Sequence, residues 1–113
     1  MLKKEFRIKD KKSIDKVFKY GRAKGSDFFL IKFIENRKDH PEVAIVISSK
    51  VSKKSVLRNK LKRQISETIR INFDKFNKNV NLIIIVSPKA LGHKFSEISE
   101  NLIHLLEEAK IIR

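Results

Sequence analysis

The side chains with the most distinctive chemistry lie in one basic stretch in the middle of the chain. Residues 50–63 read KVSKKSVLRNKLKR and include no acid. Guanidinium and ammonium groups bind phosphate oxygens, and an asparagine amide can bind a base edge, a ribose or a phosphate. At 100° per residue, a helix through this stretch places five polar residues on one face beside an apolar stripe. These are Arg58, Asn59, Lys62, Arg63 and, two turns further on, Arg70.

More cations flank that face and extend the predicted binding surface. Lys50, Lys53 and Lys54 precede the helix, and Lys60 lies within it. The free N–H groups and the dipole at a helix N-terminus also favour anions. The pattern predicts a surface that binds a polyanion. The alternative at this point is an ordinary charged helix face solvated by water.

The distribution of charge favours nucleic acid as the polyanion. The 113 residues hold 27 Lys and Arg against 13 Asp and Glu, a formal net charge of +14. Residues 1–63 carry +13 of this charge and residues 64–113 only +1. Such a one-sided field repels itself and is expected where the partner is a polyanion. An anionic membrane surface and a lysine-rich solubilising surface remain as alternatives.

Composition excludes several other classes of site. The chain has no Cys, which removes disulfides, thiol nucleophiles and zinc sites with Cys ligands. His40, His93 and His104 lie far apart, and the Asp residues are scattered, so we expect neither a metal site nor catalytic residues in the protein. No apolar run approaches the roughly 20 residues of a membrane span, and no signal peptide is evident. We expect a cytoplasmic protein that does not bind membranes.

Apolar spacing predicts one mixed α/β domain over residues 1–113, long enough for a single core. Residues 1–9 are expected to form a flexible basic arm, and Gly21 to cap the first helix in the left-handed conformation. Leu57, Leu61, Ile65, Ile69 and Phe73 form the apolar stripe of a long central helix. The expected elements are helices at residues 10–20, 52–76 and 96–110, strands at 28–34 and 43–48 paired as a hairpin, and a buried central strand at 82–86.

The sequence SVLRNKLKR at residues 55–63 resembles the signature of the protein subunit of bacterial ribonuclease P. That family has a Ser-Lys-Lys loop followed by Ala-Val-x-Arg-Asn-Arg-x-Lys-Arg at the start of its long helix. The resemblance covers almost the whole chain, including LKK at residues 2–4 and KVFKYG at residues 16–21. Four positions depart from the family: Lys60 and Ser66 replace arginines, and Ile14 and Lys32 stand where aromatic residues are usual. Residues 51–53, VSK, also differ from the usual loop.

The resemblance implies a fold and a function. The fold is an α+β, single-domain α/β sandwich in the order α-β-β-β-α-β-α, like the second domain of ribosomal protein S5, with a left-handed βαβ crossover. The function is to assist a catalytic RNA that removes the 5′ leader of precursor tRNA, with Mg²⁺ held by that RNA and the substrate. The basic helix face would bind the RNA subunit, and a cleft at Phe18, Ile14 and Lys32 would bind the single-stranded leader. No protein partner is required.

Two other functions stay open from the residues alone. A ribosomal or architectural protein could coat RNA without any role in its processing, since composition does not distinguish the two. A metal-dependent nuclease acting alone would need a cluster of acids or histidines, which the sequence does not show.

Overall fold

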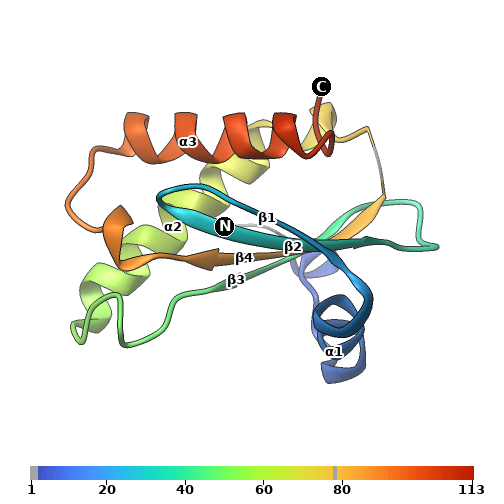
Figure 1. The fold of residues 1–113 in the computed structure, drawn as a ribbon, viewed down its shortest axis with the longest axis horizontal. Helices are drawn as coiled ribbons and strands as arrows, with labels where there is room; N and C mark the ends of the chain where they lie inside the picture. The colour runs from blue at the N-terminus through green and yellow to red at the C-terminus, as the bar shows by residue number, and fades with distance from the viewer. Residues whose placement is uncertain (1–2, 78) are drawn as a thin grey trace.

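Four strands form one mixed sheet in the order β1-β2-β4-β3 (Figure 1). A computed structural model describes residues 3–77 and 79–113. The strands are β1 (Arg22–Gly25), β2 (Phe29–Glu35), β3 (Glu42–Val46) and β4 (Val80–Val86). β2 pairs antiparallel with β1 and β4, whereas β3 pairs parallel with β4.

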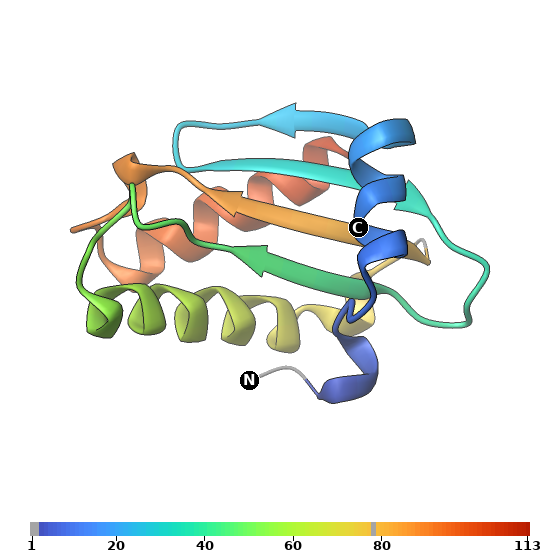
Figure 2. The same cartoon turned by 90° about the horizontal axis from the view of Figure 1, so that it is seen from below.

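Helices cover both faces of the sheet. α1 (Lys11–Tyr20) lies on one face, and α2 (Ser55–Ile71) and α3 (Phe95–Glu108) lie on the other (Figure 2). Short 3₁₀ turns occur at Lys4–Phe6, Phe73–Lys75 and Pro88–Ala90. The order α1-β1-β2-β3-α2-β4-α3 confirms the fold that the resemblance implies. With the strands pointing upward and α2 toward the viewer, β4 lies to the left of β3, so the crossover is left-handed.

β4 is the buried central strand that its apolar run predicts. Leu82 and Ile84 face the main core with α2 and α3, while Ile83 faces a smaller core with Ile8 and Val17. The predicted hairpin between residues 28–34 and 43–48 is wrong, because β4 lies between the two strands. A strand that is apolar on both faces is most stable at the centre of a sheet. The more polar β1 therefore becomes the hairpin partner of β2 at the edge.

The apolar stripe of the long helix packs as predicted, although the helix is shorter. Leu61, Ile65 and Ile69 are buried in the main core. The helix begins at Ser55 and ends at Ile71 rather than covering residues 52–76. At its C-terminus, the buried Asn72 donates from Nδ2 to the Thr68 carbonyl at 2.8 Å.

The N-terminal segment packs on the domain, so the prediction of a flexible arm is wrong for residues 3–9. The Phe6 ring lies 4.5 Å from the Phe73 ring, centroid to centroid. Ile8 is buried, and its N–H donates to the Val43 carbonyl at 3.1 Å. Ile8 is thus part of the smaller core, and the half-buried Phe6 packs on Phe73, which the surrounding lysines do not reveal. Residues 1–2 lie outside the described residues.

Gly21 ends α1 for a different reason from the predicted one. Its φ of −76° and ψ of 162° are extended and not left-handed. A Cβ atom at this position would lie 2.4 Å from the Val17 carbonyl oxygen and 2.9 Å from that of Phe33. Glycine therefore allows the end of α1 to approach β2 closely, which fixes the helix on this face of the sheet.

Candidate nucleic-acid interface

Three of the predicted RNA-binding side chains meet on the exposed side of α2. Asn59, Lys62 and Arg63 are exposed and, with Val56, line a hollow of about 430 Å³. We call Asn59, Lys62 and Arg63, together with Arg58 one turn before Lys62, the basic face of α2. Regular helical spacing brings them together, because residues three and four apart share a face. The arrangement presents cationic groups and one amide around a space that a nucleotide can enter.

Arg58 anchors the loop that leads into the helix. Its side chain is half-buried, and Nη1 donates to the carbonyl of Ser52 at 2.7 Å. Ser52 Oγ accepts in turn from the Lys54 N–H at 3.1 Å. The loop is thus held against α2, with Lys50, Lys53 and Lys54 exposed. Lys54 occupies the N-cap position and offers no side-chain acceptor there, which leaves the first N–H groups of α2 available to an anion.

Arg70 does not continue an acid-free face as the sequence predicts. Its Nε donates to Glu67 Oε2 at 3.0 Å, and Nη2 donates to Glu67 Oε1. These hydrogen bonds hold the pKa of Glu67 below its usual range. The charge of Arg70 is therefore largely balanced locally. The i,i+3 spacing of Glu67 and Arg70 is a signal for this pair that the sequence contains.

Lys60 lies on a different side of α2 from the basic face. It lines a hollow of about 460 Å³ with Arg63, Gln64, Glu67 and Phe95 of α3. Within residues 3–77 and 79–113, Lys and Arg side chains form ion pairs only at Lys38–Glu42 and Arg70–Glu67. The cations of residues 50–63 consequently keep their full charge for an external anion.

Phe18 and Lys32 meet at the side of α1. Phe18 is 45% exposed, and Lys32 Nζ lies 4.9 Å from the centroid of its ring. Ile14 is half-buried and packs on the small core formed by Ile8, Val17 and Ile83. The exposure of Phe18 rules out a core role, so its ring is available to a ligand. Ile14 instead packs between α1 and the sheet, against this small core.

A row of apolar side chains extends this surface along the sheet. Leu30, Ile85 and Val46 are register partners on three neighbouring strands, and they share the face of Lys32. Leu30 and Val46 are 39% and 42% exposed. α1 crosses only one end of the strands and leaves the other end of this face open (Figure 2). We call Phe18, Lys32, Leu30, Ile85 and Val46 the α1-side surface. This row was not predicted from the sequence, although Leu30 and Lys32 are separated by the buried Ile31, the alternation of a strand with one exposed face.

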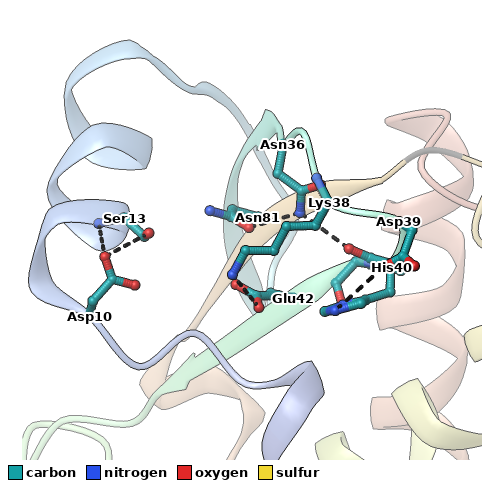
Figure 3. A network of polar contacts seen from close by, with 9 residues as sticks. Asp10, Ser13, Asn36, Lys38, Asp39, His40, Glu42 and Asn81 are labelled. Carbon is teal, nitrogen blue, oxygen red and sulfur yellow. Dashed lines mark hydrogen bonds and ion pairs between the residues drawn. The ribbon is translucent and has the colours of Figure 1, made fainter.

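A polar network fixes the end of the sheet that carries α1 (Figure 3). Asn36 Nδ2 donates to Asn81 Oδ1 at 3.0 Å, and Lys38 Nζ pairs with the buried Glu42 at 2.8 Å. This hydrogen bond raises the pKa of Lys38. Asp10 caps α1 by accepting from the Ser13 N–H at 3.1 Å and from its hydroxyl, which lowers the pKa of Asp10. These contacts hold the start of α1 and of β3 in place.

Neither a metal cluster nor a membrane span is found in the part of the chain that the structure describes. That part has no group of three or more His, Asp or Glu side chains placed to hold a metal ion. Its helices also lack the combined length and apolar character needed to cross a membrane.

Comparison with known proteins yields consistent matches. A profile of the Ribonuclease P family matches residues 2–110. The chain is 30% identical over 112 residues to the ribonuclease P protein component of Streptococcus pneumoniae (strain CGSP14), covering 99% of this chain and 90% of that protein. Its fold is similar to a Staphylococcus aureus RNase P protein mutant with defective mRNA degradation activity, with a TM-score of 0.91 and 28% identity over 96% and 92% of the two chains. The RNase P protein from Thermotoga maritima gives a TM-score of 0.81 and 27% identity over 90% and 96%.

Proposed function

Because this chain belongs to the family of bacterial ribonuclease P protein components, we propose that it is the protein subunit of a ribonuclease P. In this role it assists a catalytic RNA in the endonucleolytic removal of the 5′ leader from precursor tRNA. The observation that carries the proposal is that one domain presents two exposed surfaces, a basic face on α2 and an aromatic, cationic surface beside α1 on the other side of the sheet. The segment that joins β3 to α2 borders the open end of the α1-side surface (Figure 2).

The basic face of α2 and the loop before it are assigned to the RNA subunit. Unpaired cations on a rigid helix neutralise phosphates, and Asn59 adds a group that can reach a base edge or a ribose. Lys60 contributes charge from the neighbouring side of the helix. Arg70 contributes least, because Glu67 already occupies its guanidinium.

The α1-side surface is assigned to the leader, which is single-stranded. An exposed aromatic ring gives a base a surface on which to stack, and a neighbouring cation attracts the following phosphate. Phe18 supplies the ring, and Lys32 supplies the cation 4.9 Å away. Leu30 and Val46 offer apolar contact to a further base along the strands.

Hydrolysis of the phosphodiester bond is assigned to the RNA subunit. Mg²⁺ bound by that RNA and by the substrate would neutralise charge and activate the attacking water. The carboxylates of the described residues are dispersed over the fold and form no set of oxygen ligands for such an ion. In this assignment the chain positions RNA, and the RNA subunit carries out the bond-breaking step.

Reconstitution tests the proposed function directly. We expect purified protein alone and ribonuclease P RNA alone to be nearly inert on precursor tRNA at low Mg²⁺, and the mixture to cleave at the mature 5′ end. The products are measured on a gel that resolves the leader. If the protein binds the RNA without increasing cleavage, an architectural role replaces the proposal. Cleavage by RNA-free protein would instead support a nuclease acting alone.

A substitution on α1 tests the assignment of the leader. We expect Phe18→Ala to weaken binding of precursor tRNA to the holoenzyme by about 5- to 150-fold, which corresponds to the roughly 1–3 kcal/mol of one base stack. Mature tRNA has no leader, so its affinity is expected to stay unchanged. Tyr20→Ala is a matched control, because Tyr20 is 65% exposed and lines a separate hollow with Arg22 and Glu35. Equal losses for precursor and mature tRNA would contradict the assignment.

A further inference from the structure

A small hollow lies where the N-terminal segment meets the outer edge of β3 and the middle of α2. Its volume is about 170 Å³. We call it the sheet-edge hollow, and its lining residues are Arg7, Ile8, Val43, Ala44, Ile45, Lys62 and Ser66. Two of these residues are cations and none is an acid. Lys62 also belongs to the basic face of α2, so the hollow opens beside the surface assigned to RNA.

Ser66 lines this hollow and is almost completely buried. The residue is 2% exposed, and none of the side-chain hydrogen bonds found among residues 3–77 and 79–113 involves its hydroxyl. Thr68, two residues later, behaves differently, since its hydroxyl donates to the Gln64 carbonyl at 2.9 Å. No described side-chain polar atom is both fully enclosed and unpaired, so the small accessible part of Ser66 includes its hydroxyl, which faces the hollow.

The edge of β3 supplies a second donor. The Val43 carbonyl accepts from Ile8, so the backbone polar groups of Val43 point away from β4. Those of Ile45, two residues along the strand, point the same way. The N-terminal segment then turns into α1, and the Ile45 N–H is left without a backbone partner in the described chain. An unpaired edge N–H is a donor that seeks an acceptor.

We propose that the sheet-edge hollow binds one phosphodiester group of the RNA subunit. Arg7 and Lys62 supply positive charge, while the Ser66 hydroxyl and the Ile45 N–H donate to the phosphate oxygens and fix its orientation. The inference rests on the proposed function and extends the basic face of α2, with which the hollow shares Lys62, to the edge of β3. Arg7 also lines a neighbouring hollow that contains carboxylates, so the two neutral donors and Lys62 carry the specificity.

Ser66→Ala tests this site, because it removes one hydroxyl and changes no charge. We expect affinity for ribonuclease P RNA to fall about tenfold, equivalent to about 1.4 kcal/mol. The salt dependence of binding is expected to stay unchanged, since the same number of phosphates is neutralised. Ser99→Ala makes the same chemical change at a half-buried position of α3 and is expected to bind like the unmodified protein. Melting temperatures verify that both variants fold.

A competition experiment identifies the source of the phosphate. At constant ionic strength, replacing chloride by inorganic phosphate is expected to weaken RNA binding by the unmodified protein more than binding by Ser66→Ala. Nuclear magnetic resonance of the Ile45 amide then reports on binding of inorganic phosphate itself. If phosphate shifts this amide while Ser66→Ala binds RNA normally, the hollow takes a free anion and the inference is wrong. If the unmodified protein does not bind the RNA at all, the proposed function fails instead.

Discussion

We expect the affinity of this chain for ribonuclease P RNA to fall about a thousandfold between roughly 50 and 200 mM monovalent salt. The basic face of α2 and the preceding loop offer cations without ion-pair partners in the described residues, enough for about six phosphate contacts. Each contact releases counterions from the RNA, so the logarithm of the affinity falls linearly with the logarithm of the salt concentration. Equilibrium binding at four or five salt concentrations gives the slope.

Single charge removals locate the source of that slope. Lys62→Gln removes one phosphate contact and is expected to reduce the slope by about one. Lys110→Gln removes the same charge in the near-neutral half, beyond the end of α3, and is expected to leave the slope unchanged. A nearly flat salt response of the unmodified protein would mean that the +13 half is not the binding surface.

The second large effect is expected at Arg58. Arg58→Ala is expected to weaken assembly with the RNA by roughly 10- to 150-fold, or about 1.5–3 kcal/mol, the range for charge-assisted hydrogen bonds. Two losses are expected to contribute: the RNA would lose the guanidinium proposed to bind it, and the loop before α2 loses its anchor at the Ser52 carbonyl. Arg58→Lys keeps the charge without the planar fork, so an intermediate affinity is expected if the fork itself matters.

Lys94→Ala is the control for Arg58→Ala. Lys94 is exposed at the N-cap of α3, and its backbone N–H, which the substitution keeps, donates to Glu97 at 3.0 Å. We expect a loss of only a few tenths of a kcal/mol in RNA binding. Equal losses for Arg58→Ala and Lys94→Ala would show that binding is delocalised electrostatics without a specific site. Melting temperatures separate either result from unfolding.

Local patterns predict the elements of this fold better than their partners. The four-residue spacing of Leu61, Ile65 and Ile69 predicts the buried side of α2, because helix periodicity depends only on neighbours in sequence. The pairing of β3 depends instead on β4, which lies beyond α2 in the chain. The strand nearest to β3 in the sequence is β2, and a hairpin would pair these two. β4 lies between them instead, because it is apolar on both faces.

The candidate site also contains some features that local sequence patterns predict and others that depend on the folded chain. The basic face of α2 follows from helical spacing, so its members can be chosen from the sequence. The exposure of Phe18 depends on how far α1 covers the sheet, and the burial of Ile8 depends on Val43. The sheet-edge hollow joins Arg7, near the N-terminus, to Ser66 in α2, and only the folded chain brings them together.

The late arrival of β4 in the chain sets the order in which the protein can fold during synthesis. β4 lies between β2 and β3, and it is made after α2. A nascent chain that ends before Val80 has the β1–β2 hairpin but nothing to join β3 to it. The whole basic half thus leaves the ribosome, itself rich in RNA, before the sheet can close. Completion of an apolar strand in the near-neutral half is therefore what converts a mobile polycation into a surface with defined geometry.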